Sequence, residues 1–471
     1  MTGYMNTDLL VIGGGSGGLS VAAGAVQMGA GVVLLEGHKM GGDCLNYGCV
    51  PSKALLAAAK HAHAMTAGKP FGVHPVDPHV SYAVAKDHVQ SVIAAIEPHD
   101  SVERFEGLGV HVIQAFGKFV NHNTVEADGV RITARRIVIA TGSRPFVPPI
   151  PGLEDVPYLT NESLFDLRDQ PKHLIIIGGG PIGLEMAQAH RRLGSNVTVL
   201  EGAKALGKDD PELAEIALRQ IRAEGVEIVE GALADRISGG QGDITVHTKD
   251  GASYRGSHLL MAVGRTAAID KLDLEKAGVA YSAAGVTVDK GLKSSNRRVY
   301  AIGDAAGGLQ FTHVAGYHAG IVIRSALFGL PAKASTAHIP WATYTAPEIA
   351  QVGLTEAEAR KAHGIHLEVL RFEYKGNDRA LAERATEGLI KVMVHKGRPV
   401  GASIVGAQAG ELIQTWALVI ANKLKIGAVA NMVAPYPTLG EINKRVAGQY
   451  YVPRLFENER VKRFVRFIQR I

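Results

Sequence analysis

Two stretches in the first two-thirds of the chain show the same order of apolar residues and glycines. "DLLVIGGGSGG" is a continuous apolar run that leads into a glycine cluster, and "HLIIIGGGPIG" repeats that order further along the chain. Each is followed by a helix-like run and by a second apolar run that ends in an acid, at Glu36 and at Glu201. Gly13 precedes Glu36 by 23 residues, and Gly178 precedes Glu201 by 23 residues. The pattern therefore predicts two βαβ units.

Both units carry the spacing G-x-G-x-x-G directly after the predicted strand. In such a turn the first glycine permits the tight bend, the second lets a pyrophosphate approach the backbone, and the third lets the helix pack closely on the strand. The helix N-terminus then faces the phosphates, and the acid accepts hydrogen bonds from a ribose hydroxyl. We expect a dinucleotide at two sites, the first with Gly13, Gly15, Gly18 and Glu36, and the second with Gly178, Gly180, Gly183 and Glu201.

The rest of the chain also alternates between helical and strand patterns. Residues 53–107 are rich in Ala, His and Glu and are predicted to be helical. Residues 135–145, 259–266 and 297–307 each have the pattern of a short strand followed by a turn. From about residue 337 the pattern indicates an antiparallel sheet with helices. The predicted class is therefore α/β, with two Rossmann-like dinucleotide-binding domains and a C-terminal α+β domain.

Composition and charge narrow the class of protein. The chain has 471 residues, of which 46% are hydrophobic, and its net charge of +5 gives no argument for nucleic acid. Residues 9–35 carry no charge, but glycines interrupt them, so we expect no membrane span. The N-terminus lacks the basic segment of a signal peptide. Because the chain has only two cysteines, no extracellular disulfide framework is expected, and the predicted location is cytoplasmic.

The two cysteines, Cys44 and Cys49, lie in "GGDCLNYGCVPSKALL", after a glycine turn and at the start of a predicted helix. Two thiolates do not complete a tetrahedral metal site, so we expect no metal. A structural disulfide over so short a loop would constrain little of the unfolded chain. A redox disulfide fits better, because a helix N-terminus lowers the pKa of a thiol. Lys53, on the same predicted helix, is either a cation beside a flavin or thiolate or an ordinary solvated lysine.

The stretch "GGDCLNYGCVPSK" resembles the redox-active segment of the FAD-dependent pyridine nucleotide–disulfide oxidoreductases, of the mercuric reductase and dihydrolipoamide dehydrogenase type. The resemblance covers essentially the whole chain. It implies that the first dinucleotide site holds FAD, that the second holds NAD(P)H, and that a C-terminal domain forms a homodimer. The implied domains are residues 1–148 for FAD with the redox helix, 149–270 for NAD(P), 271–336 for a return to the central region, and 337–471 for dimerisation.

The resemblance also implies roles for individual residues. Electrons would pass from the nicotinamide through the flavin to Cys49, on the flavin side, and then to Cys44, the interchange cysteine that meets the acceptor. Lys53 would approach the flavin N5 edge, and Glu185 would pair with that lysine. Besides the glycine turns and their acids, the implied cofactor-binding residues are Ser16, Gly42, Lys53, Ala115, Thr141, Gly142, Ser143, Gly264, Arg265 and Asp304.

Glu201 bears on the choice of nicotinamide cofactor. An acid at that strand end favours NAD, because the 2′-phosphate of NADP would meet a like charge. Arg191, Arg192 and Lys204 are near in sequence and could soften this preference. We therefore predict NADH, with NADPH as the alternative.

One position departs from the family's pattern. Relatives that act on small disulfides have a His-Pro-x-x-x-Glu segment, whose histidine exchanges a proton with the interchange thiol. In "YPTLGE" the glutamate is present as Glu441, but Tyr436 takes the place of the histidine. A tyrosine with a pKa of about 10 cannot carry a proton at neutral pH as a histidine does. Mercuric reductase has a tyrosine at this position, but the C-terminal cysteine pair of that enzyme is not present in this sequence.

The electron acceptor is therefore left open. The leading hypothesis is a mercuric-reductase-like flavoenzyme with an unidentified acceptor. The alternatives are a dihydrolipoamide dehydrogenase, a quinone or metal-ion reductase, and a redox-sensing nucleotide-binding protein with little turnover. Tyr436 argues against the dehydrogenase, and the combination of Lys53, Glu185 and both cysteines argues against the sensor.

The C-terminal segment has the pattern of a basic amphipathic helix. Its apolar positions recur at helical spacing, at Val461, Phe464, Val465 and Ile468. Basic residues cover the remaining positions, at Arg460, Lys462, Arg463, Arg466 and Arg470. Such a helix either packs on its own dimer or lies on an anionic membrane surface, and the sequence leaves both open.

Overall fold

The computed structural model describes residues 3–470, and the chain separates into two compact units. The first unit extends to Gly178 and also contains Ala189–Leu200 and Ala232–Ala334. The second contains Gly179–Gln188, Glu201–Gly231 and the chain from Ser335 onward. Helices and strands alternate in both, which confirms the predicted α/β class. The four predicted domain ranges stay a prediction.

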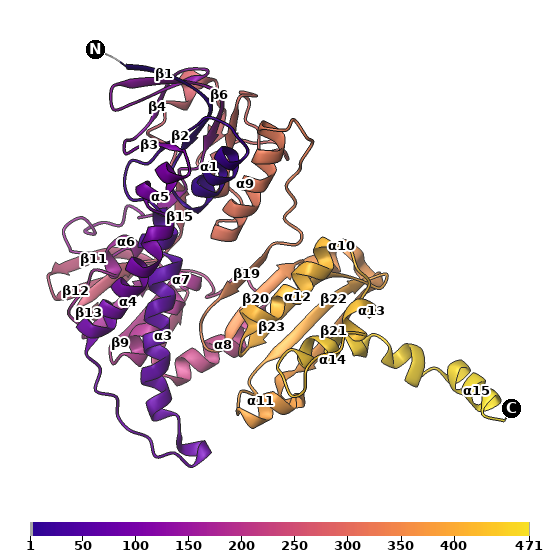
Figure 1. Ribbon diagram of the computed structural model, residues 1–471. Coiled ribbons are helices and arrows are strands. Elements are labelled where there is room, and N and C mark those ends of the chain that lie inside the picture. Colours follow the sequence, from indigo (N-terminus) through magenta and orange to yellow (C-terminus); the bar gives the residue numbers. More distant parts are fainter. Residues whose placement is uncertain (1–2, 471) are drawn as a thin grey trace. The chain divides into compact units, whose positions relative to one another are not determined.

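A seven-stranded sheet forms the centre of the first unit (Figure 1). Its order is β3-β2-β1-β6-β5-β4, with β18 also paired to β6. The pairs among β1, β2, β3, β6 and β18 are parallel, and β4 and β5 form antiparallel pairs. The strands are β1 Gly3–Ile12, β2 Val32–Leu35, β3 His111–Ile113, β4 Lys118–Asn121, β5 Thr124–Ala127, β6 Val130–Ile139 and β18 Val299–Ala301. The helices of this unit are α1 Ser16–Gln27, α2 Gly42–Asn46, α3 Cys49–Thr66, α4 Tyr82–Ile96, α5 Val102–Gly107, α6 Asn161–Leu164 and α9 Thr312–Ala326.

Alternate residues of the central strand β1 enter two different cores. Leu9 and Val11 pack with buried residues of α1 and α9, which lie together on one face of the sheet in Figure 1. Leu10 and Ile12 pack with Phe119 on the opposite face. Successive side chains of a strand point to opposite faces, so a strand that is covered on both faces must be apolar throughout. This explains the unbroken apolar run "LLVI" and fixes the glycine turn at its carboxyl end.

Three smaller groups of strands complete the first unit. Strands β9, β8 and β14 are parallel neighbours, whereas β11-β12-β13, β7-β15 and β16-β17 are antiparallel. Their bounds are β7 Ser143–Pro145, β8 His173–Ile177, β9 Asn196–Glu201, β11 Ala234–Gly240, β12 Asp243–Thr248, β13 Ser253–Gly256, β14 His258–Met261, β15 Arg265–Ala267, β16 Tyr281–Ser282 and β17 Gly285–Val286.

An antiparallel five-stranded sheet, in the order β19-β20-β23-β22-β21, forms the centre of the second unit. Trp416 of helix α12 is fully buried in its core, and the Trp416 Nε1–H donates to Asn443 Oδ1 at 2.8 Å. The strands are β10 Val226–Glu230, β19 Pro340–Thr343, β20 Glu348–Gly353, β21 Leu367–Glu373, β22 Leu389–His395 and β23 Arg398–Gly406. The helices are α8 Pro211–Ala223, α10 Glu356–His363, α11 Asp378–Ala382, α12 Ala409–Ala421, α13 Gly427–Ala430, α14 Glu441–Gln449 and α15 Glu459–Ile468, with α7 Pro181–Arg192 beginning in this unit.

Within residues 3–470, the model contains no helix that combines the length and the apolar character that crossing a bilayer requires.

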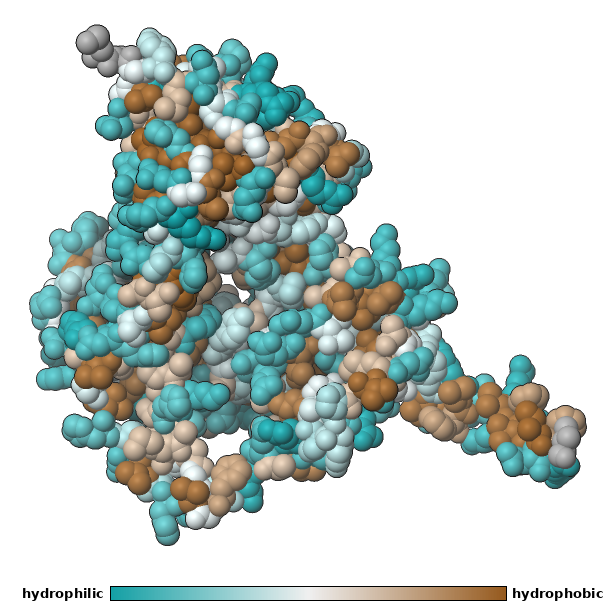
Figure 2. Space-filling model, in the orientation of Figure 1, coloured by the Kyte–Doolittle hydropathy of each residue, from teal (hydrophilic) through white to brown (hydrophobic). Residues whose placement is uncertain are grey.

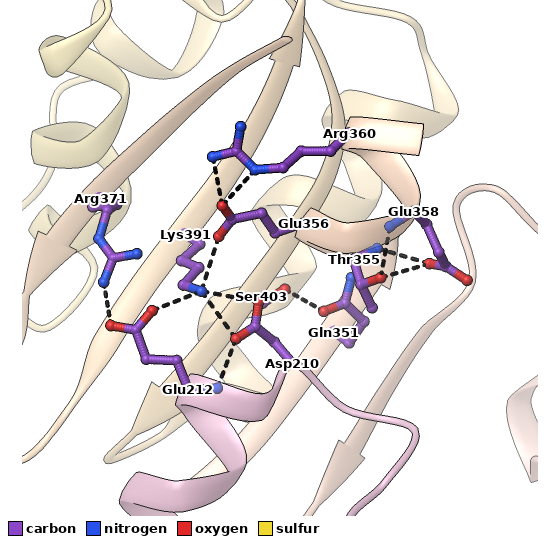
Figure 3. Close-up of polar contacts among 10 residues, drawn as sticks. All are labelled: Asp210, Glu212, Gln351, Thr355, Glu356, Glu358, Arg360, Arg371, Lys391 and Ser403. Atoms are coloured by element: carbon purple, nitrogen blue, oxygen red, sulfur yellow. Dashed lines mark hydrogen bonds and ion pairs between the residues drawn. The ribbon is translucent and has the colours of Figure 1, made fainter. Parts of the chain in front are cut away.

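A buried lysine joins helix α8 to the five-stranded sheet within the second unit (Figure 3). Lys391 of β22 is 4% exposed, and its ammonium group lies 2.9 Å from Asp210, 2.8 Å from Glu212 and 2.9 Å from Glu356. Asp210 also caps the N-terminus of α8 by accepting from the Glu212 N–H. A hydrogen bond from Arg371, supported by Lys391, lowers the pKa of Glu212 to about 2. The cation is therefore shared by carboxylates from two chain segments.

We expect Lys391→Met to lower the free energy of unfolding of the second unit by about 3–5 kcal/mol, because Asp210 would stay buried without its cation. Urea unfolding monitored by tryptophan fluorescence measures this, since Trp341 and Trp416 both lie in the second unit. Lys375→Met is the matched control, because its ion pair with Glu373 is exposed and should contribute far less to stability. Equal losses of stability for the two variants would contradict the expectation.

Candidate active site

The first glycine turn follows β1, and two of its positions can accommodate only glycine. Gly13 has φ +112°, and a Cβ there would lie 2.4 Å from the Ala140 carbonyl oxygen. A Cβ on Gly18 would lie 1.9 Å from the Gly13 carbonyl oxygen. The Gly14 N–H donates to Glu36 Oε2 at 2.6 Å, so the acid at the end of β2 is held against the turn.

The segment that carries both cysteines lies directly against this turn. The Gly41 N–H donates to the Gly14 carbonyl at 2.9 Å, and Gly15 and Gly41 form an isolated parallel bridge. A Cβ on Gly42 would lie 2.7 Å from the Gly15 Cα, so this close approach also requires glycine. Cys44 lies in the short helix α2, and α3 begins at Cys49.

The two cysteines are free thiols that interact with each other. Cys44 is half-buried and Cys49 is exposed. Their mutual hydrogen bond, followed by burial, raises the pKa of Cys44, and it lowers the pKa of Cys49 to about 6. Cys49 also lies 3.4 Å from Thr312 Oγ1, and both Thr312 and the charge of Lys53 favour its thiolate. Of the two sulfurs, Cys49 is therefore the one that carries negative charge when the pair is reduced.

Several of the predicted cofactor-binding residues surround this region in the first unit. The Ser143 Oγ–H donates to Asp304 Oδ2 at 2.6 Å, and the Arg265 Nε–H donates to Ser143 Oγ at 2.7 Å. Burial raises the pKa of Asp304. Residues 143–145 of β7 pair with 265–267 of β15, and Gly142 and Gly264 precede these strands with positive φ. Ala115 follows β3 and is half-buried.

These residues fit the FAD that the resemblance implies. Gly15 leaves the backbone open at the N-terminus of α1, whose first turn, beginning at Ser16, contains no acid that would repel a pyrophosphate. The Thr141 Oγ1 is buried and has no hydrogen-bond partner among the residues that the structure describes. Buried hydroxyls normally have a partner, so a polar ligand group fits there.

The second glycine turn repeats the geometry of the first. Gly178 has φ +116°, and a Cβ there would lie 2.3 Å from the Ala262 carbonyl oxygen. The Gly179 N–H donates to Glu201 Oε2 at 2.7 Å, as Gly14 does to Glu36. Gly180 has open space beside it, and Gly183 is buried near the start of α7. The two predicted βαβ units are therefore present, each with its acid bound to the turn.

Side chains of α7 are bound to the segment that precedes β20. The Tyr344 N–H donates to Glu185 Oε1 at 2.9 Å, and Glu185 is 4% exposed. The Ala346 N–H donates to Gln188 Oε1 at 2.7 Å, which fixes the same helix at its next turn. Both contacts lie within the second unit. The predicted pairing of Glu185 with Lys53, which lies in the first unit, stays a prediction.

Tyr436 is 70% exposed, and its hydroxyl donates to Asp378 Oδ2 at 2.9 Å. This hydrogen bond, followed by the charge of Asp378, raises the pKa of Tyr436 above its ordinary value. Glu441 begins α14 five residues further along the chain. Relatives with a histidine at this position can exchange a proton there. In this chain the residue is a tyrosine that holds its proton more tightly than an ordinary tyrosine does.

Three polar residues beside the cysteines were not predicted from the sequence. Thr312 approaches Cys49 from the start of α9. Asp43, directly before Cys44, forms an ion pair with Arg265 at 3.0 Å, and Asn161 Nδ2 donates to Asp43 Oδ1 at 3.0 Å. The sequence offered one signal for this cluster, the acid Asp43 in "GGDC", and that signal did not identify the residues that bind Asp43.

Among the described residues, no group of three or more His, Cys, Asp and Glu side chains is arranged to hold a metal ion.

Comparisons with known proteins agree with this arrangement. The model of the pyridine nucleotide-disulphide oxidoreductase family matches residues 7–319, and that of the dimerisation domain of the same family matches residues 339–447. A mercuric reductase of Bacillus cereus is 36% identical over 449 residues, which cover 93% of this chain and 70% of that protein.

Two further relatives cover almost the whole chain. A dihydrolipoyl dehydrogenase of Bacillus subtilis (strain 168) is 32% identical over 454 residues, covering 92% of this chain and 96% of that enzyme. The Cu(II) complex of the HOCl-induced flavoprotein disulfide reductase RclA from Escherichia coli has a TM-score of 0.83 and 29% identity, covering 93% of this chain and 99% of that one. The chain therefore belongs to the pyridine nucleotide–disulphide oxidoreductase family, as an FAD-dependent enzyme of the disulfide reductase type that uses a pyridine nucleotide and carries a dimerisation domain.

Proposed function

We propose that this enzyme transfers electrons from NADH, through FAD and the Cys44–Cys49 pair, to a thiophilic metal ion such as Hg(II) or Cu(II). The observation that carries the proposal is the hydrogen bond from Tyr436 to Asp378, which raises the pKa of the tyrosine. A side chain that keeps its proton at neutral pH cannot exchange it with a thiol. An acceptor that takes electrons without a proton is compatible with such a site.

The relatives support a metal ion as the acceptor. Mercuric reductases from six organisms are 32–36% identical to this chain. One structure of the E. coli flavoprotein disulfide reductase is a Cu(II) complex. Lipoamide is the second candidate, because a dihydrolipoyl dehydrogenase is 32% identical. It is less compatible with Tyr436, because disulfide exchange with a small thiol requires a proton carrier.

The cysteines have separate roles in the proposal. When bound, FAD supplies a two-electron carrier between the nicotinamide and the disulfide. Cys49 faces the flavin, and its lowered pKa favours the thiolate. Cys44, whose pKa is raised, keeps the proton of the reduced pair and meets the acceptor. Lys53 approaches the flavin edge and Glu185 orients it, whereas Tyr436 and Glu441 of the other subunit of a homodimer border the acceptor site.

The proposed cofactor contacts follow the two turns and the β7–β15 region. For FAD they are Gly13, Gly15, Ser16, Gly18, Glu36, Gly42, Lys53, Ala115, Thr141, Gly142, Ser143, Gly264, Arg265 and Asp304, and for the nicotinamide dinucleotide Gly178, Gly180, Gly183 and Glu201. The Glu201 carboxylate favours NADH, because a 2′-phosphate would meet its charge. Lys204 could offset that charge, but its ammonium lies 3.7 Å from Glu230, which competes for it.

Anaerobic stopped-flow mixing tests the acceptor. We expect NADH to bleach the flavin absorbance faster than NADPH, and Hg(II) or Cu(II) to reoxidise the reduced enzyme faster than lipoamide, glutathione disulfide or a quinone. Tyr436→His should raise the rate with lipoamide by about 100-fold, since it supplies the missing general acid–base group.

Tyr436→Phe is the control for this experiment. It removes the hydroxyl without adding a proton carrier, so the rate with lipoamide should stay at the wild-type level. A wild-type enzyme that lipoamide reoxidises fastest would overturn the metal-ion proposal. If neither NADH nor NADPH bleached the flavin, the proposal that NAD(P)H is the electron donor would be wrong.

We also propose that helix α15 binds an anionic membrane surface. None of its residues is buried, and Figure 2 shows hydrophobic residues gathered along it. Phe464 and Phe467 are 62% and 63% exposed. The helix carries four basic residues and one acid, which is the composition of a helix that lies in a lipid headgroup layer. The chain itself has a net charge of +5, so charge favours an anionic lipid over a second copy of the chain.

Vesicle flotation tests this contact. We expect the enzyme to float with phosphatidylglycerol vesicles but not with phosphatidylcholine vesicles. Phe464→Ser/Phe467→Ser should abolish flotation by removing the apolar face. Arg463→Gln/Arg466→Gln should weaken flotation and make the binding that remains less sensitive to salt. Ile365→Ser is the matched control, because this residue is 95% exposed outside α15. The contrary result is a Phe464→Ser/Phe467→Ser variant that still floats with the vesicles and that light scattering shows to be a monomer. That result would assign the helix to the dimer interface instead of the membrane.

A further inference from the structure

A carboxylate lies beside the interchange cysteine and is held in place by two side chains from distant segments. Asp43 directly precedes Cys44 in α2, and its side chain is 35% exposed. Its Oδ1 accepts from Asn161 Nδ2 at 3.0 Å and lies 3.0 Å from Arg265 Nη2. The same Asn161 Nδ2 donates to the Tyr47 carbonyl at 3.1 Å, so the loop between the two cysteines is bound at both ends.

Arg265 links this loop to the residues of the flavin site. Its side chain is only 13% exposed. Its Nη2–H donates to the Ser143 carbonyl at 2.9 Å, and its Nε–H donates to Ser143 Oγ, which in turn donates to Asp304. One guanidinium is therefore placed between two carboxylates, Asp43 and Asp304. Interactions between charges are strong in such a poorly hydrated place.

The negative charge of Asp43 reaches both sulfurs. Its charge acts to raise the pKa of Cys44 and of Cys49, as a minor contribution beside their mutual hydrogen bond. Reduction of the disulfide creates negative charge at the same place. An uncompensated Asp43 would therefore oppose reduction, and a guanidinium paired with Asp43 would remove that opposition.

We propose that Asp43 and Arg265 form a charge couple that sets the equilibrium between the oxidised and the reduced Cys44–Cys49 pair. Both are positioning residues with respect to the sulfurs: Arg265 acts through Asp43, and Asp43 acts by its field. The inference rests on the proposed function, in which these cysteines are the redox pair. It adds to that function a means by which the chain adjusts the driving force of electron transfer.

The equilibrium is defined by a balanced exchange. The enzyme disulfide and one dithiothreitol molecule react to give the enzyme dithiol and the cyclic disulfide of the reagent. The Cys44–Cys49 S–S bond breaks and one forms in the reagent. Two electrons and one proton move to the enzyme, whose Cys49 becomes the thiolate, and the second thiol proton of the reagent goes to the buffer. The constant can be measured on the holoenzyme by alkylating the free thiols at a fixed pH and counting them by mass spectrometry.

Single and double variants separate the charge effect from a structural one. We expect Asp43→Asn to favour the dithiol by about tenfold and Arg265→Gln to disfavour it by about tenfold. The double variant, which removes both charges, should return close to the wild-type constant. Arg265→Lys should restore most of the constant, because it keeps the positive charge. Arg144→Gln is the matched control. It breaks the exposed ion pair between Asp270 and Arg144 of β7, the strand that pairs with β15, and it should leave the constant unchanged.

The outcomes distinguish the inference from the function on which it rests. If Asp43→Asn and Arg265→Gln shift the constant in the same direction, the pair is only a structural clamp and the inference is wrong. It is also wrong if neither variant shifts the constant. If the wild-type cysteines form no reversible disulfide in the dithiothreitol buffer, the proposed redox pair itself is wrong.

Discussion

The contact between the first glycine turn and the cysteine segment is the constraint on which the rest of the active site depends. The Gly41 N–H is bound to the Gly14 carbonyl, and Gly42 approaches Gly15 so closely that Gly42 could not carry a side chain without displacement. The start of α3 is thereby fixed relative to the turn that fits a dinucleotide. With FAD bound at this turn, two backbone segments rather than mobile side chains would set its distance from the cysteines.

The sequence predicted the features whose causes are local. The two βαβ units, the acids at Glu36 and Glu201 and the antiparallel character of the C-terminal region follow from periodicity and from the backbone demands of glycine, and the structure contains all of them. The partners of the cysteine loop could not be predicted in this way. Asp43 meets Arg265, 222 residues away, and no pattern in one sequence specifies such a contact. Whether the site residues bind their cofactors as the resemblance implies stays a prediction.

The core of the second unit also contains a contact between distant residues that the sequence could not predict. The strand "LIKVMVH" indicates a buried strand by its apolar residues, and Lys391 in its middle would ordinarily mark an exposed position. The lysine is buried because Asp210, Glu212 and Glu356 converge on it from α8 and α10. A buried charge with full partners is costly to break but adds little net stability, so its effect is to select one register of helix on sheet.

In the proposed function, electrons and protons would reach the cysteines by different routes. A histidine opposite the interchange thiol would remove the proton of the reduced pair each time the acceptor is reduced. Tyr436, bound to Asp378, keeps its own proton, so charge at the sulfurs must be balanced by fixed groups. The thiolate of Cys49 is favoured by Thr312, Lys53 and the hydrogen bond from Cys44, and the paired Asp43 and Arg265 add no net charge beside it. In the proposed function, such a site would suit a metal ion, which takes electrons without taking a proton, better than a disulfide that must exchange protons with the thiols.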